Sequence, residues 1–163
     1  MYDRPLTIEQ NLTMLADTPS RLADLTKGLS AAQLLASPEP DEWSARDVLA
    51  HLRACSDMWG KYIAQILSED HPTIKVVNPT TWVKQTNYRE QAFRPSLRAF
   101  TAQRAELLDV LTPLAPEAWS RSALVTGAGK PRERTVSTYA MWLANHERSH
   151  FKQIERIVNA LRV

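Results

Sequence analysis

The chain has 163 residues, of which 44% are hydrophobic and 23% are charged, and its formal net charge is +2. This composition excludes a disordered chain and fits one folded domain over residues 1–163 with a buried core. The small charge and the lack of a Lys/Arg cluster argue against nucleic-acid binding, and no segment is apolar for long enough to cross a membrane. The single cysteine and the absence of a signal-like first segment predict a cytoplasmic protein.

Apolar residues spaced three and four apart predict four long helices and an all-α fold. These helices span about residues 7–26, 44–67 and 95–111, and from 135 or 137 to the end of the chain. The segment 71–87 has no sustained period and contains two prolines, so a long loop is expected between the second and third helices. No stretch alternates convincingly enough to predict a β-sheet.

Local signals support these boundaries. Ser44 and Asp47 have the spacing of a capping box at the start of the second helix, and Gly28 follows the first helix as a stop signal. Pro95 is a favoured first-turn residue, and Pro113 blocks continuation of the third helix.

A short internal repeat relates the two halves of the chain. The blocks 28–34 and 113–119 have a similar layout, and each follows one long helix and precedes the next. Two helix pairs of similar build would place His51 and His146 on related faces.

The predicted fourth helix contains the run His146-Glu147-Arg148-Ser149-His150. Side chains four residues apart lie on one helical face, so the two imidazoles can converge on one metal ion. The run also matches the HExxH pattern of zinc peptidases, in which the glutamate is the general base. Those enzymes take a third ligand from downstream, and residues 151–163 offer only Glu155, five positions on. A peptidase is therefore not favoured.

His51 is the candidate third ligand, because it lies on the apolar face of the second helix. Burying three imidazoles without partners is costly, whereas a shared metal would satisfy all three. Three histidines with an open fourth position are typical of a catalytic site. Zinc or nickel is expected, and iron or manganese could bind the same nitrogens.

The chain resembles the DinB/YfiT-like superfamily of small four-helix-bundle metalloproteins over essentially its full length. The resemblance rests on Trp43-Ser44, the run DVLAHL at 47–52, and the last-helix pattern of His146, His150 and Gln153. It implies an up-down-down-up type of bundle, a divalent metal held by three histidines, and a homodimer. Family members with known roles are transferases or isomerases that use a low-molecular-weight thiol such as mycothiol, bacillithiol or glutathione.

The expected function is a metal-dependent enzyme acting on a small molecule. A low-molecular-weight-thiol S-transferase comes first, because a metal with an open position can hold a thiol as its thiolate. Two alternatives stay open. The site could activate a water molecule for hydrolysis, or the metal could be structural or vestigial in a bundle without activity.

Further residues have weaker predicted roles. Glu147 could be a general base, but one step along a helix turns a side chain by about 100°, which favours a solvated or supporting position. Gln153 could hydrogen-bond a ligating imidazole and fix its tautomer. Cys55 faces the same way as His51 and is either a fourth ligand or a small buried residue.

Two tyrosines are also candidates. Tyr62 and Tyr139 are expected in the core, from where their hydroxyls could reach a substrate pocket. The loop 71–87 would supply one wall of that pocket.

Overall fold

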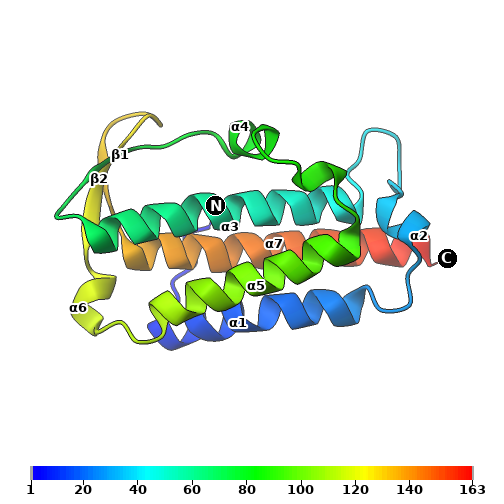
Figure 1. Ribbon diagram of the computed structural model, residues 1–163, viewed down its shortest axis with the longest axis horizontal. Helices are drawn as coiled ribbons and strands as arrows, with labels where there is room; N and C mark the ends of the chain where they lie inside the picture. Colours follow the sequence, from blue (N-terminus) through cyan, green and yellow to red (C-terminus); the bar gives the residue numbers. More distant parts are fainter. Residues whose placement is uncertain (1, 163) are drawn as a thin grey trace.

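Four long helices dominate the structure, a computed structural model that describes residues 2–162. They are α1 (Ile8–Leu25), α3 (Ala45–Ser68), α5 (Phe93–Leu111) and α7 (Val136–Leu161). α1 and α7 run in one direction along the bundle, and α3 and α5 run in the other (Figure 1). The predicted four-helix bundle is confirmed, with boundaries close to those expected and the up-down-down-up order that the resemblance implied.

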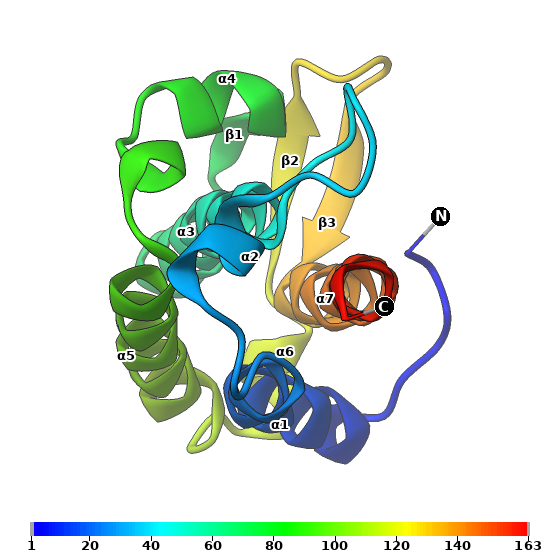
Figure 2. The same cartoon turned by 90° about the vertical axis from the view of Figure 1, so that its right-hand side faces the viewer.

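Each long helix packs against two others. α1 and α3 both contact α5 and α7, so the four helices form a ring when viewed end on (Figure 2). The pair α3 and α7 is antiparallel, and its contact surface extends along most of the bundle. This α3–α7 seam contains all three histidines that were predicted to bind metal.

The connection between α3 and α5 is long because these two helices run in the same direction. The chain must return along the whole bundle before α5 can begin, as Figure 1 shows. The connection contains strand β1 (Thr73–Lys75), helix α4 (Pro79–Lys84) and the 3₁₀ helix η1 (Tyr88–Glu90). The predicted long loop is thus present, with short elements of its own.

The expectation that the chain has no sheet is wrong. β1 pairs in parallel with β2 (Ser122–Thr126), and β2 pairs in antiparallel fashion with β3 (Arg132–Thr135). The strands have three to five residues, too few for an alternating pattern to stand out from the sequence. β1 is also far from its partner along the chain, and such long-range pairing has no local signal.

The two repeated blocks form short helices at opposite ends of the bundle (Figure 1). They are α2 (Ala31–Leu35) and α6 (Pro116–Trp119), and each leads from one long helix toward the next element. None of the helices within residues 2–162 has the length and apolar character needed to cross a membrane.

The core consists of two apolar clusters separated by a polar layer. One cluster surrounds Trp59 and Tyr139 near the sheet, and the other surrounds Leu49 and Phe100 toward α2. The polar layer centres on Arg104, whose side chain is 1% exposed. Burying a guanidinium so deeply requires a partner for its charge and acceptors for its N–H groups.

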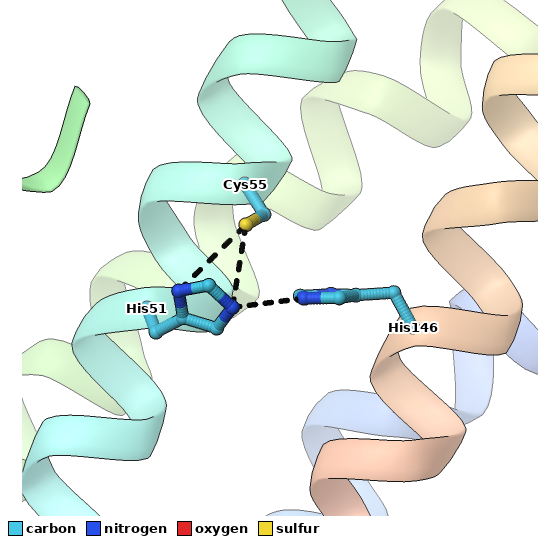
Figure 3. Close-up of side chains that lie close together, drawn as sticks. All are labelled: His51, Cys55 and His146. Carbon is cyan, nitrogen blue, oxygen red and sulfur yellow. Dashed lines mark hydrogen bonds between the residues drawn. The ribbon is translucent and has the colours of Figure 1, made fainter. Parts of the chain in front are cut away.

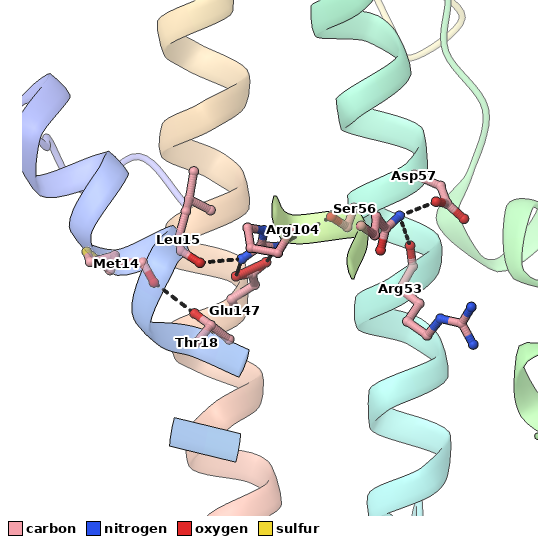
Figure 4. A network of polar contacts seen from close by, with 9 residues as sticks. Met14, Leu15, Thr18, Arg53, Ser56, Asp57, Arg104 and Glu147 are labelled. Atoms are coloured by element: carbon pink, nitrogen blue, oxygen red, sulfur yellow. Dashed lines mark hydrogen bonds and ion pairs between the residues drawn. The ribbon is translucent and has the colours of Figure 1, made fainter. Parts of the chain in front are cut away.

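Arg104 of α5 contacts the three other long helices (Figure 4). It forms a bidentate ion pair with Glu147 of α7, in which Nη1 is 2.7 Å from Oε1 and Nη2 donates to Oε2. Nη1 also donates to the backbone oxygen of Leu15 in α1 at 2.8 Å, and Nη2 to the hydroxyl of Ser56 in α3 at 3.3 Å.

The backbone oxygen of Leu15 in α1 is free to accept from Arg104 for a local reason. Pro19 lies inside α1 and has no N–H, so the carbonyl of Leu15 four residues earlier lacks its helical donor. Arg104 supplies that donor instead. A helix interior that would otherwise be weakened by proline is therefore compensated by a side chain from another helix.

We expect Glu147→Gln to lower the free energy of unfolding by about 3 kcal/mol or more, because it leaves the Arg104 charge buried without its counter-ion. Urea unfolding at neutral pH measures the loss. Glu155→Gln, at an exposed position on the same helix, is the matched control and should change stability by less than about 0.5 kcal/mol. The double variant Arg104→Met/Glu147→Met should be more stable than Glu147→Gln. A Glu147→Gln protein as stable as wild type would contradict this role of the pair.

Candidate metal centre

The structure brings the three predicted histidines together across the α3–α7 seam. His51 Nε2 of α3 lies 2.9 Å from His146 Nε2 of α7. The His150 ring lies 4.7 Å from the His51 ring and 4.4 Å from the His146 ring, measured between centroids. Figure 3 shows His51 and His146 meeting from opposite helices.

Local sequence places these side chains. Ser44 caps α3 by accepting from the Asp47 N–H at 3.1 Å, while the Asp47 carboxylate accepts from the Ser44 N–H at 3.1 Å. This predicted capping box fixes where α3 begins, and His51 follows in the second turn. On α7, His146 and His150 are one turn apart on the face that meets α3.

Burial keeps the three imidazoles neutral. His146 is 3% exposed, and His51 and His150 are partly buried. Desolvation, reinforced by the nearby His150, lowers the pKa of His51 to about 4. Desolvation, with the neighbouring His150 and His51, lowers the pKa of His146 to about 2, and desolvation also lowers the pKa of His150. Neutral imidazole is the form that binds metal ions.

Gln153 orients His150 as a metal ligand would need. Its Oε1 lies 2.7 Å from Nδ1 of His150. An amide oxygen only accepts, so Nδ1 carries the proton and the lone pair on Nε2 is left free. The predicted hydrogen bond between Gln153 and an imidazole is therefore present in the structure, with His150 as the donor and Gln153 as the acceptor.

Cys55 joins the same group of donor atoms. Its Sγ lies 3.6 Å from His51 Nε2, and one donor atom each from His51, Cys55 and His146 lie within 4.8 Å of one another (Figure 3). Burial, with the Glu147 charge as a smaller cause, raises the pKa of the thiol to about 12. The thiol is thus protonated at neutral pH in the metal-free protein.

Glu147 turns away from the imidazoles. It is 1% exposed and is bound by Arg104 in the polar layer, so of the two expected positions, solvated or supporting, the solvated one is wrong. Both of its carboxylate oxygens accept from the Arg104 guanidinium. The rotation of about 100° between neighbouring helix positions explains why the two imidazoles and this carboxylate face different sides.

Aromatic residues surround the imidazoles. Tyr2 and Trp59 pack edge-on against His146, at centroid distances of 5.2 and 5.1 Å, and Trp43 lies 5.3 Å from His51. The first segment is tied down because the Asn145 amide donates to the backbone oxygens of Tyr2 and Arg4, at 2.9 and 3.0 Å. Sequence analysis missed Tyr2, since no pattern links it to residues more than 140 positions away.

The imidazole cluster opens toward solvent at His150. A hollow of about 380 Å³ there gives a small molecule a route to the imidazole edge. Its lining residues come from the α2–α3 connection and from α7: Asp41, Glu42, Trp43, His150, Gln153, Arg156 and Ile157.

The two predicted pocket tyrosines are found in a different cavity. Tyr62 and Tyr139 line a space of about 210 Å³ together with Val76, Val77 and Pro79 of the long connection. The Tyr62 hydroxyl accepts from the Val77 N–H at 3.2 Å. The connection therefore does form a wall, but Cys55 is not among the lining residues of this cavity.

The donor set fits a divalent metal ion. Two nitrogens bound at about 2.0–2.1 Å to one tetrahedral zinc ion would be roughly 3.3 Å apart, close to the 2.9 Å between His51 and His146. The other nitrogen of His146, Nδ1, is buried with no hydrogen-bond partner among residues 2–162, so no second hydrogen bond of the described chain fixes the tautomer of this ring.

Comparison with known proteins gives consistent matches. The sequence profile of the DinB superfamily matches residues 14–154. A protein of Halalkalibacterium halodurans, whose name assigns it provisionally to the metal-dependent hydrolases, is 24% identical over 147 residues, covering 90% of this chain and 85% of its own length. The structure of YfiT from Bacillus subtilis, described as a probable metal-dependent hydrolase with an unusual four-helix bundle topology, superposes with a TM-score of 0.80 at 16% identity, covering 96% of this chain and 90% of YfiT.

We expect the metal-free protein to lose stability as the pH falls from about 7.5 to 5. The folded-state pKa values of the clustered histidines lie below the ordinary value of 6.5, so below pH 6.5 protons bind preferentially to the unfolded chain. The loss should reach at most about 1.4 kcal/mol per pH unit for each histidine. Urea unfolding in the presence of a chelator measures it. The double variant His51→Asn/His146→Asn should flatten the dependence, and an unchanged slope would contradict the assignment.

Proposed function

The chain belongs to the DinB superfamily, and from this premise we propose that it is a metal-dependent hydrolase whose divalent metal ion is held by His51, His146 and His150. The observation that carries the proposal is the convergence of three neutral imidazoles from two antiparallel helices, with His51 Nε2 and His146 Nε2 2.9 Å apart. The names given to the two relatives support hydrolysis as the chemistry.

The bound metal would act as a Lewis acid and lower the pKa of water toward neutrality, with zinc or nickel best suited to nitrogen donors. The protein's own residues do the remaining work. Gln153 holds His150 in the tautomer that leaves Nε2 free. Trp59 and Tyr2 shield one side of His146 from water, while the hollow beside His150 admits the substrate.

Glu147 is not the base of this proposed reaction. Both of its oxygens are bound by Arg104 on the side of α7 away from the seam. Its role in the proposal is structural.

A thiol transferase, which sequence analysis placed first, would use the same metal ligands. The comparisons with known proteins give it no support, since both named relatives are described as metal-dependent hydrolases. Hydrolysis is therefore the proposed chemistry, and a thiol requirement is left to experiment.

We expect protein purified without a histidine tag to contain about one divalent metal ion per chain. His51→Ala, His146→Ala and His150→Ala should each lose most of it, because each removes one of three ligands. Gln153→Ala should weaken metal binding by about tenfold or more by freeing the His150 ring. Elemental analysis and competition with a chelator give these values.

Cys55→Ser is the matched control for the metal measurement, because it changes a neighbouring donor atom while keeping the side-chain size. It should retain the metal. Loss of the metal in Cys55→Ser would replace the open three-histidine site with a closed site, and equal metal in wild type and His51→Ala would remove the proposal.

We also expect the metal-loaded protein to hydrolyse activated esters or amides without added thiol, and His51→Ala to lose this activity while remaining folded. A survey of such substrates with and without a chelator measures it. Turnover that appears only when glutathione or another small thiol is added would overturn hydrolysis in favour of thiol transfer.

A further inference from the structure

A second site lies one to three helical turns along the α3–α7 seam from the imidazoles. The cavity of about 210 Å³ that contains Tyr62 and Tyr139 is found where the sheet covers the end of α3 and the start of α7. Figure 2 shows the strands standing over these two helices. The volume is below the range of about 300–1,000 Å³ typical of drug-sized ligands, so it suits a small molecule.

The wall of the cavity is aromatic. Trp59 and Tyr62 come from α3, and Tyr139 and Trp142 come from α7. The rings contact one another at centroid distances of 5.5 to 6.5 Å, which makes a continuous apolar surface. Such a surface favours the flat, apolar body of a ligand.

The rim of the same cavity is positively charged. Lys130, Arg132 and Arg134 line it, and no aspartate or glutamate is among its described lining residues. Successive side chains of a strand alternate between faces, so Arg132 and Arg134 share one face of β3 while Glu133 points to the other, where it binds His71 at 2.8 Å.

One carboxylate lies near this rim. Asp3 accepts from the Trp142 indole N–H at 2.8 Å, and this hydrogen bond is the largest cause that lowers the pKa of Asp3, with the Arg134 charge as a smaller cause. Arg134 in turn lies over the Trp142 ring, 4.9 Å from its centroid. Three cations against one carboxylate leave the rim with a net positive charge.

Tyr139 supplies an unused hydrogen-bonding group. The residue is 1% exposed and lines the cavity, and its hydroxyl is buried without a hydrogen-bond partner within the described part of the chain, residues 2–162. Burial, with Tyr62 nearby, raises the pKa of Tyr139 to about 12, so the phenol is a protonated donor at neutral pH. Burying a hydrogen-bond donor without an acceptor destabilises the folded protein, unless a ligand supplies the acceptor.

We propose that this cavity binds a small organic anion with an aromatic body, such as an aryl carboxylate. The body packs against the tryptophan and tyrosine rings. The carboxylate accepts from the Tyr139 hydroxyl and is attracted by Arg132 and Arg134. This site goes beyond the proposed hydrolase, because its lining contains none of the three histidines. Trp59 links the two sites, since its ring packs on His146 and also lines the cavity.

Phenylacetate and its neutral amide, phenylacetamide, are matched probes for this proposal. Titration of the full-length protein, followed by calorimetry and by tryptophan fluorescence, should show saturable binding of phenylacetate that is about tenfold tighter than that of phenylacetamide. Arg132→Gln/Arg134→Gln should weaken phenylacetate binding by about tenfold or more, since charge-assisted hydrogen bonds are the strong ones. The same variant should bind the amide as wild type does.

Tyr139→Phe tests the hydroxyl. It should weaken phenylacetate binding by about tenfold. It should leave the melting temperature of the ligand-free protein unchanged or higher, because the hydroxyl it removes has no partner in the fold. Arg98→Gln, an exposed arginine on α5, is the control and should bind both probes as wild type does.

The outcomes separate this site from the metal centre. His51→Ala and chelated wild type should bind phenylacetate as before, so failure of the hydrolase proposal would leave this one standing. Equal binding of phenylacetate and phenylacetamide, unchanged binding in both cavity variants, or no saturable binding of phenylacetate below about 10 mM would each overturn it.

Discussion

The structure depends on one buried guanidinium. Arg104 reaches from α5 to Glu147 of α7, to the carbonyl of Leu15 in α1 and to Ser56 in α3, and thereby holds all four long helices at one level. The interaction also fixes the rotation of α7. With Glu147 held toward α5 and α1, the neighbouring His146 is turned by about 100° toward α3, where His51 meets it. The ion pair and the imidazole cluster thus lie on two different faces of the same turn of α7.

This arrangement shows that the glutamate of the HExxH run does not have the surroundings that it has in a zinc peptidase. In a peptidase the glutamate needs free oxygens beside the metal ligands. Here the glutamate neutralises a buried arginine, and its removal is predicted to affect stability first. The two imidazoles keep the spacing of metal ligands, and their third partner comes from upstream, on an antiparallel helix. The run from His146 to His150 therefore forms a different kind of site, because its side chains have different contact partners.

The α3–α7 seam organises the functional features in a line. The hollow at His150, the imidazole cluster and the aromatic cavity follow one another along the two helices, and Trp59 contacts both the cluster and the cavity. The sheet closes one end of this line and brings Arg132 and Arg134 over it. The sheet combines β1 of the α3–α5 connection with the β2–β3 hairpin. It thus adds positively charged side chains to a seam in which the helices contribute mostly aromatic rings and imidazole nitrogens.

Sequence alone determined the features that depend on local periodicity. The four helices, the capping box at Ser44, the convergence of His146 and His150 on one face and the candidacy of His51 all follow from spacings of three and four residues. Only the tertiary structure decided the rest. The sheet pairs strands about fifty residues apart, Tyr2 reaches His146 across nearly the whole chain, and Arg104 finds Glu147 and the carbonyl that Pro19 leaves free. These contacts leave no trace in a local pattern, because each residue's partner is set by how the helices pack and not by its neighbours in the chain.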